Sequence, residues 1–354
     1  MQDTHTLPEW VFRDCPVMSL PDRDAALQRQ AELTKPAGSL GRLETLAVEL
    51  AGLQHIERPK AARVPIIIFA GDHGIAAQGV SAYPQQVTIA MMANFSAGGA
   101  AISVLARELG ATLEVIDAGT LAETALPGIV IDKPRRGTRD FSTEEALAPN
   151  EVAFAFACGE RAVARASSPD LLIFGEMGIG NTTTAAAIAA ALLATSPDRL
   201  AGSGTGLDPA GRDRKARLIA AALARHGLGA GNAAVERVLC AVGGLEILAM
   251  SGAIIAAAQR RIPVLIDGFI VSVAALAAVR LNPSCRPYLI FSHRSAEQGH
   301  RLVLDALEAR PLLDLDLRLG EGSGAALALP LLRLACALHN GMATFAEAAV
   351  PGPA

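Results

Sequence analysis

The chain has 354 residues, a length that allows one large domain or two modest ones. Its formal net charge of −4 provides no basic surface for nucleic acid or for an acidic membrane, so neither is expected as a partner. Hydrophobic residues make up 51% of the chain and aromatic residues 4%, so the core must consist mainly of Ala, Leu, Val and Ile, a composition that favours α/β architecture.

The cysteines and the apolar segments argue for a reduced, cytoplasmic protein. The five cysteines are scattered and contain no CxxC pair, so the sequence indicates neither a disulfide framework nor a zinc site. The N-terminus lacks the basic start and apolar core of a signal peptide. The longest apolar segment, residues 239–258, is interrupted by Glu246 and a Gly-Gly pair, which predicts a buried helix or helix pair instead of a membrane span.

The first part of the chain reads as an arm followed by helices. Residues 1–21 contain three prolines and no periodic pattern, which predicts an extended arm. Residues 22–54 are predicted to be helical, with a break at residues 34–44. Strand candidates then alternate with helical stretches, so we expect a Rossmann-like, mostly parallel sheet flanked by helices. These candidates are residues 64–70, 112–117, 128–131, 171–174, 262–266 and 287–291.

Polar residues and glycines follow these strands. Taken singly, each is best explained as a polar loop residue, but the repetition predicts a ligand site at the carboxyl edge of the sheet. Asp72, His73 and His293 are among them, yet no HxxxH, HxH or carboxylate cluster accompanies them, so no metal site is predicted. The residues concerned are Asp72 and His73, Asp117, Glu176, Asp267, and Ser292 and His293.

Residues 170–194 form the most informative stretch. A short apolar strand is followed by a loop containing Gly175, Gly178 and Gly180, and then by an Ala-rich helix for which Asn181 or Thr182 is a candidate N-cap. A glycine turn at a helix N-terminus suits a phosphate, although a tight structural turn explains the same pattern. The carboxylate of Glu176 either meets ribose hydroxyls or a cationic ligand, or is a solvated loop residue.

A second element suited to phosphate is GSGTGLDPAGRDRK, residues 202–215. Asp208 is a credible N-cap with a proline at the first helical position, so a helix is predicted from there to about Arg225. Lys215 lies two turns into this helix and can reach a phosphate or a carboxylate such as Glu176. The alternative is an ordinary solvated lysine among several arginines.

A third element is RLGEGSGAALALP, residues 318–330. Apolar and charged residues alternate along residues 312–319, which lead into it, and this alternation predicts a strand. Glycines crowd a single acid, Glu321, before an Ala/Leu helix. A carboxylate held there against the core has a raised pKa and suits a general base. It equally suits a carboxylate that interacts with the helix dipole.

Several motifs, in this order, resemble those of the nicotinate-nucleotide–dimethylbenzimidazole phosphoribosyltransferase family of cobalamin lower-ligand synthesis. The resemblance runs from about Lys35 to the C-terminal helices and lies in KPAGSLGRLE, GDHG, GEMGIGNTT, LIDGF, RPYLIFSH and RLGEGSGAALALP. It implies transfer of phosphoribosyl from nicotinate mononucleotide to 5,6-dimethylbenzimidazole without a cofactor. It also implies a homodimer, with a catalytic α/β domain at 60–310 and a smaller helical domain from 1–59 and 311–354.

The resemblance also implies roles for individual residues. Glu321 matches the general base, and Glu176 and Lys215 match active-site residues. The backbone of two glycine loops is expected to hold the phosphate, at Gly178, Gly180, Asn181, Thr182, Gly202 and Gly204. The expected benzimidazole pocket contains Tyr83, Met91 and Leu319. The family commonly carries Asn where this chain has Asp140.

Two other functions remain open from the residues alone. A different nucleotide-binding transferase or kinase would use similar glycine loops, although no Lys-Ser/Thr pair follows the glycines here. A nucleotide-sensing module would bind nicotinate mononucleotide without consuming it and would tolerate the loss of the Glu321 carboxylate.

Overall fold

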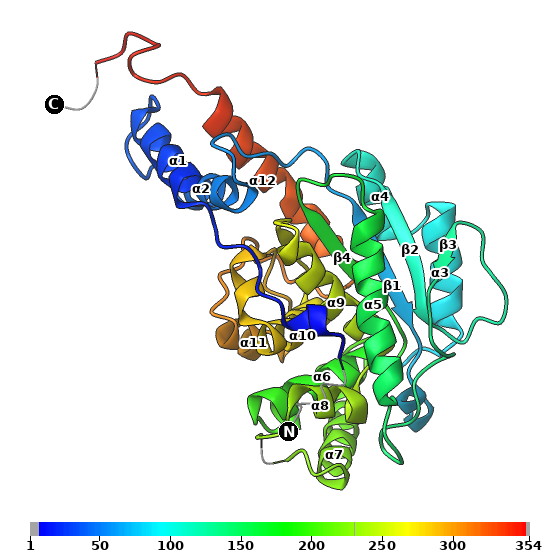
Figure 1. The fold of residues 1–354 in the computed structure, drawn as a ribbon. Coiled ribbons are helices and arrows are strands. Elements are labelled where there is room, and N and C mark those ends of the chain that lie inside the picture. The colour runs from blue at the N-terminus through cyan, green and yellow to red at the C-terminus, as the bar shows by residue number, and fades with distance from the viewer. Residues whose placement is uncertain (1–6, 230, 352–354) are drawn as a thin grey trace.

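The computed structural model describes residues 7–229 and 231–351, in which six strands form one parallel sheet flanked by helices (Figure 1). The strand order β3-β2-β1-β4-β5-β6 is that of the doubly wound nucleotide-binding folds and confirms the Rossmann-like prediction. All six predicted strands are present, and β4 continues through Glu176. The strands are β1 (Ile66–Gly71), β2 (Leu113–Gly119), β3 (Ile129–Ile131), β4 (Leu172–Met177), β5 (Val264–Ile266) and β6 (Leu289–Phe291).

Alternate residues of each strand bury opposite faces of the sheet, because successive side chains point to opposite sides. On β1, Ile66 and Ile68 pack with α2, α4 and α12, whereas Ile67 and Phe69 pack with α5, α9 and α10. Strands buried on both sides explain the unbroken apolar run of this strand. The helices are α1 (Leu20–Glu32), α2 (Arg42–Gln54), α3 (Val87–Ala97), α4 (Ala101–Glu108), α5 (Pro149–Arg165), α6 (Asn181–Leu193), α7 (Pro209–Arg225), α8 (Val235–Val242), α9 (Leu245–Gln259), α10 (Phe269–Leu281), α11 (His300–Ala306) and α12 (Ser323–Gly341).

Most helix predictions are confirmed. Residues 22–54 form α1 and α2 with the expected break, and α7 begins after Asp208, whose carboxylate accepts a hydrogen bond from the Gly211 amide at 2.7 Å. Residues 239–258 lie in the helix pair α8 and α9. The five cysteines are buried free thiols.

The strand predicted at residues 312–319 is wrong. The segment is extended, but its backbone forms a single bridge, between Leu313 and His293, and Asp316 has a φ of +54°, which ends any regular strand. Leu315 and Leu319 are 59% and 60% exposed, so the alternation does not mark a half-buried face. The segment instead runs along the loop that follows β6.

The N- and C-terminal segments pack together at the end of the molecule remote from α7, where α1, α2 and α12 cluster (Figure 1). Leu33 pairs with Thr344 in an antiparallel bridge, and the Arg29 guanidinium donates to three carbonyl oxygens at and beyond the end of α12. The division into two domains stays a prediction. Of the predicted arm, residues 1–6 lie outside the described residues, and the Asn282 amide donates to the carbonyls of Val11 and Arg13.

One segment, Val87–Glu108, meets the length and hydropathy expected of a membrane span. The structure divides it at Gly98, which has a φ of +82°, into α3 of 11 residues and α4 of 8 residues. An 11-residue helix rises only about 16 Å. Neither helix alone therefore crosses a hydrocarbon core of about 30 Å.

Replacing Gly252 with Ala is expected to destabilise the fold, because α9 crosses α5 there at backbone contact. A Cβ at Gly252 would lie 2.7 Å from the Cα of Phe156 and closer still to its carbonyl oxygen. Overpacking of this kind typically costs about 1–3 kcal/mol, and thermal unfolding followed by circular dichroism measures it. Gly341→Ala, also helical but with open space around its Cα, is the matched control. Equal midpoints for the two variants would contradict this reading of the crossing.

Candidate active site

A cavity of about 490 Å³ opens at the carboxyl edge of the sheet. The ends of β4, β5 and β6 contribute Glu176, Asp267 and His293, beside the point where the strand order reverses between β1 and β4. The structure brings most of the predicted site residues to this cavity, whereas Lys215, Gly180 and Gly202 do not line it. Those that do are Tyr83, Met91, Glu176, Gly178, Asn181, Thr182, Gly204, Leu319 and Glu321.

The first glycine loop leads into the N-terminus of α6. Gly180 is the N-cap, with a φ of +99° that favours glycine, and it has no side chain to cap the helix. The expectation that Asn181 or Thr182 caps α6 is therefore wrong. Asn181 is the first helical residue, and its side-chain amide donates a short hydrogen bond to Glu176. Among the described residues no side chain caps the first turn of α6, although the amides of Asn181 and Thr183 donate to the backbone carbonyls of Gly178 and Gly180. A helix N-terminus without a side-chain cap suits an anion.

Lys215 lies behind the second glycine loop. Its Nζ donates to Thr182 Oγ1 at 2.9 Å and to the carbonyl of Gly202 at 3.5 Å, and the residue is 1% exposed. Burial lowers the pKa of this ammonium to about 8, and the nearby carboxylate of Glu297 partly opposes that shift. Within the described chain, Glu176 is no ion-pair partner of this lysine, so the charge points toward the glycine loops.

Glu297 closes the second glycine loop from the other side. Its Oε1 accepts the Gly204 amide at 3.1 Å, while its buried Oε2 has no hydrogen-bond partner among the described residues. A Cβ at Gly202 would overlap this carboxylate, which explains the need for glycine there. Gly202 therefore supports the site from behind.

Glu321 occupies a strained turn directly above β4. Gly320, Glu321 and Gly322 have φ angles of +91°, +62° and +76°, and left-handed backbone at a residue other than glycine costs roughly 1–2 kcal/mol. A Cβ at Gly175 would lie 2.5 Å from the carbonyl carbon of Glu321, so the turn rests on the backbone of the strand. Strain held in this way fixes the position of the Glu321 carboxylate.

The carboxylates of the cavity raise one another's pKa values. Burial raises the pKa of Glu176 to about 8, and the charges of Asp267, Glu246 and Glu321 add to the effect. The pKa of Glu321 is also raised, mainly by burial and further by Asp267. Its Oε2 is buried without a hydrogen-bond partner in the described part of the chain. An acceptor oxygen with a raised pKa is what a general base needs.

A buried hydrogen-bonded network supports the first glycine loop. His73 Nε2 lies 2.7 Å from Glu246 Oε1, and His73 Nδ1 lies 2.9 Å from Thr184 Oγ1 on α6. A Cβ at Gly178 would lie 3.2 Å from His73 Nε2, so the ring forms the floor of the loop. Both ring nitrogens are thus occupied, and no group of three or more His, Cys, Asp or Glu side chains that could hold a metal occurs among residues 7–229 and 231–351.

The expected benzimidazole residues reach the cavity from two segments of the chain. Tyr83 and Met91 come from the segment after β1, and Leu319 comes from the segment before the Glu321 turn. Thr205 Oγ1 accepts from the Ala82 amide at 3.1 Å and lies 2.9 Å from Ser81 Oγ, which ties the Tyr83 segment to the second glycine loop. The cavity therefore has an apolar wall as well as its acidic floor.

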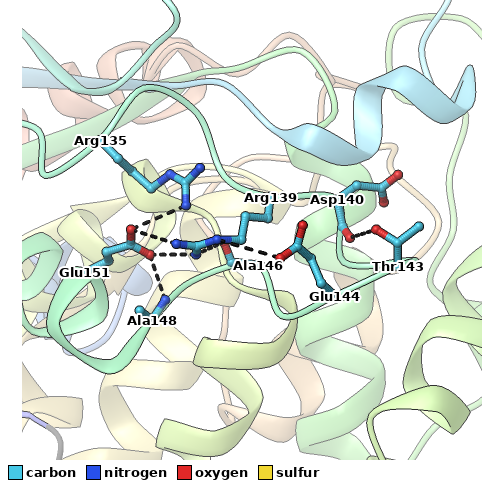
Figure 2. A network of polar contacts seen from close by, with 8 residues as sticks. All are labelled: Arg135, Arg139, Asp140, Thr143, Glu144, Ala146, Ala148 and Glu151. Atoms are coloured by element: carbon cyan, nitrogen blue, oxygen red, sulfur yellow. Dashed lines mark hydrogen bonds and ion pairs between the residues drawn. The ribbon is translucent and has the colours of Figure 1, made fainter.

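The loop containing Asp140 does not line the cavity. Arg139 contacts Glu151 through two hydrogen bonds, of 2.8 and 3.1 Å, and the Ala148 amide donates to the same carboxylate (Figure 2). The Asp140 carboxylate accepts from Gln78 at 2.7 Å and from the amide of Ser142 at 2.9 Å. Asp140 therefore acts in a loop that packs behind the segment following β1.

Sequence reasoning missed several polar residues of the cavity. Asp267 and His293 belong to the polar pattern that follows the predicted strands, and both line the cavity, but that pattern alone assigns neither of them a role. The Asp267 carboxylate accepts from the Ala325 amide at 2.9 Å and so holds the start of α12. Glu297 and Arg318 carried no such signal, since both lie in irregular segments after β6.

Replacing Glu176 with Gln is expected to flatten the pH dependence of stability. The folded-state pKa of about 8 exceeds the ordinary value of 4.5, so between these values the native state binds a proton that the unfolded chain lacks. Stability should fall as pH rises through this window, and the slopes of the two proteins should differ by up to about 1.4 kcal/mol per pH unit. Denaturant unfolding at several pH values measures it. Glu123→Gln, at an exposed position, should keep the wild-type slope; an unchanged slope in Glu176→Gln contradicts the prediction.

Comparisons with known proteins agree on one family. A phosphoribosyltransferase family model matches residues 17–350. The nicotinate-nucleotide–dimethylbenzimidazole phosphoribosyltransferase of Bradyrhizobium diazoefficiens is 74% identical over 98% of this chain and 99% of its own length. The protein of that name from Pseudomonas savastanoi pv. phaseolicola is 56% identical over 96% and 97%. The crystal structure of the Thermus thermophilus protein of that name superposes with a TM-score of 0.89 at 42% identity, covering 95% of this chain and all of the other. With a cavity that joins a phosphate-suited helix end to a buried carboxylate, this chain belongs to the nicotinate-nucleotide–dimethylbenzimidazole phosphoribosyltransferase family.

Proposed function

We propose that this chain transfers the phosphoribosyl group of nicotinate mononucleotide to 5,6-dimethylbenzimidazole, giving α-ribazole 5′-phosphate and nicotinate for assembly of the cobalamin nucleotide loop. One observation carries the proposal. A single cavity contains both the N-terminus of α6 and the buried Oε2 of Glu321, and no described residue caps the one with its side chain or hydrogen-bonds to the other. The names of the relatives supply the substrates.

The phosphate binds at the first glycine loop in this proposal. Gly178 and Thr182 line the cavity at a helix N-terminus, where partial positive charge favours an anion. Lys215 reinforces the site through its bond to Thr182 Oγ1, and Gly204 brings the second loop close to the same hydroxyl. This arrangement fixes one end of the donor and leaves the ribose to extend toward Glu321.

Glu321 acts as the general base. One benzimidazole nitrogen attacks C1′ from the face opposite the pyridinium, so the β configuration is inverted to α, and the other nitrogen loses its proton to Glu321 Oε2. The departing nicotinate neutralises its own pyridinium charge and needs no general acid. Holding the two rings in line lowers the barrier further through proximity.

Glu176 faces the positive charge of the donor in this mechanism. Its pKa of about 8 reflects burial beside other carboxylates, and a bound pyridinium ribosyl cation favours the ionised form. The ionised carboxylate then stabilises the oxocarbenium-like charge that develops at C1′. Asn181 keeps the side chain oriented through its short hydrogen bond to Glu176.

Tyr83, Met91 and Leu319 contact the acceptor ring and set its specificity. An apolar wall discriminates small ring substituents by only about 1–3 kcal/mol, so related aromatic bases are expected to be accepted to some degree. Tyr83 is 56% exposed and Leu319 60% exposed at this wall, and a second copy of the chain would cover such apolar surface. We therefore also propose a homodimer.

The experiment is to incubate the purified protein with nicotinate mononucleotide and 5,6-dimethylbenzimidazole and to separate the products chromatographically, with each substrate omitted in turn. Nicotinate and α-ribazole phosphate should appear together, and only when both substrates are present. Binding of the nucleotide without release of nicotinate would contradict transfer and favour a sensing module. Release of nicotinate without the base would indicate a hydrolase.

A further inference from the structure

The titratable residues that line the cavity are mostly acids. Four carboxylates face it, and they belong to Glu176, Asp267, Glu297 and Glu321. Among the described residues of the lining, Arg318 alone carries a permanent positive charge. His293 also lines the cavity, but burial lowers its pKa, which favours the neutral imidazole. An anionic group entering this part of the cavity therefore has one cation available to it.

The guanidinium of Arg318 has no ion-pair or hydrogen-bond partner in the part of the chain that the structure describes. Other arginines near the sheet edge are engaged: Arg294, for example, pairs with Asp314, and Arg286 donates to the carbonyls of Leu307 and Leu289. Lys215 is committed to Thr182 and Gly202. Among the described residues, Arg318 is thus the one cavity cation free to meet a ligand.

The backbone on both sides of Arg318 is held in place. The Ala296 amide donates to the carbonyl of Leu317 at 2.9 Å, which anchors the segment to the loop after β6. On the other side, Gly320 packs against the Glu176 carboxylate and opens the strained turn of Glu321. The guanidinium therefore projects from a fixed point three residues before Glu321.

Resting on the proposed function, we propose that Arg318 binds the ring carboxylate of the nicotinate moiety and thereby selects nicotinate mononucleotide over nicotinamide mononucleotide. The donor has two anionic ends, separated by its ribose. The phosphate end has the glycine loops and Lys215, whereas without Arg318 the nicotinate carboxylate would meet no permanent positive charge among the described residues of the lining. Arg318 is a specificity-determining residue in this account.

The chemistry of the two donors explains the selection. A guanidinium presents parallel N–H donors that match the two oxygens of a carboxylate. A carboxamide offers one oxygen and directs its own N–H group at the same cation, and it carries no charge to attract it. The contact also persists after bond cleavage, because the released nicotinate keeps its carboxylate.

The test compares kcat/KM for the two mononucleotides, with 5,6-dimethylbenzimidazole as acceptor, in wild type and Arg318→Ala. We expect wild type to prefer the acid and the variant to lose that preference by about 10- to 100-fold, the size of a lost hydrogen bond to a charged group. The fall in kcat/KM should affect nicotinate mononucleotide, whereas kcat/KM for nicotinamide mononucleotide should change little. Arg318→Lys keeps the positive charge but loses the paired N–H donors of the guanidinium. Its preference for the acid should lie between those of wild type and Arg318→Ala.

Arg294→Ala is the matched control, because Arg294 lies on the adjoining loop, pairs with Asp314 at the surface and does not line the cavity. It should keep the wild-type preference. An unchanged preference in Arg318→Ala, or equal losses for both donors, would overturn the inference and leave the transferase reaction intact. Calorimetric titration with each mononucleotide, without acceptor, tests the same preference by affinity, so the inference is judged even if transfer is not observed.

Discussion

Replacing Glu321 with Gln is expected to lower turnover by about 10²–10⁴-fold, the usual value of general base catalysis. Gln keeps the size of the side chain and its place in the strained turn, but it cannot accept the benzimidazole proton. The base is buried, has a raised pKa and has one unpartnered oxygen among the described residues, so the loss should be in kcat more than in either KM. Steady-state assays with both substrates varied measure it.

Two comparisons separate loss of the base from damage to the turn. Circular dichroism of Glu321→Gln should match wild type and its thermal midpoint should not fall, since Gln preserves the backbone at 320–322 and replaces a carboxyl whose burial raises its pKa. Glu308→Gln, a second acid with positive φ that does not line the cavity, should leave turnover unchanged. Turnover of Glu321→Gln within a few-fold of wild type would remove Glu321 from the role of base.

Lys215→Met is expected to weaken use of nicotinate mononucleotide far more than use of 5,6-dimethylbenzimidazole. Met fills the buried space of the lysine stem but carries no charge to support Thr182 and the phosphate. Removing one partner of a buried charged contact typically costs about 2–5 kcal/mol, which corresponds to a fall in kcat/KM for the nucleotide of roughly 30- to several-thousand-fold. Initial rates with one substrate saturating and the other varied give the two effects.

Lys60→Met provides the comparison for this variant. Lys60 precedes β1 at the amino edge of the sheet, away from the cavity, and its backbone amide donates to the side chain of Gln54. Its loss should change neither apparent KM. Equal rises in both apparent KM values of Lys215→Met would contradict a role for the lysine at the phosphate.

The sheet could be predicted because its signals are local. A strand such as β1, with the run Ile66–Gly71, is apolar throughout because helices cover both of its faces, and that pattern is visible without the fold. The alternation of apolar and charged residues at 312–319 predicted a strand that does not form. Asp316 breaks the regular backbone, and Leu315 is exposed instead of packing on a sheet. Periodicity records side-chain spacing, but it does not record whether a partner strand is present.

The site was only partly predictable, because its parts meet through tertiary packing. The glycines predicted the phosphate loop and the Glu321 turn, because close contact between backbone segments and positive φ angles both require glycine. The buried pair of His73 and Glu246 joins residues 173 positions apart, and no local pattern links them. Arg318 likewise gains significance only when the four carboxylates around it are seen in one cavity.

The most direct test of the central claim is a single-turnover reaction with enzyme in excess over nicotinate mononucleotide and with 5,6-dimethylbenzimidazole present, followed by proton nuclear magnetic resonance. The proposed direct displacement predicts one nicotinate released for each ribosyl transferred, and a product whose anomeric proton reports the α configuration. A β product would show that configuration is retained and that displacement occurs twice. No nicotinate release would show that the cavity binds the nucleotide without transferring it.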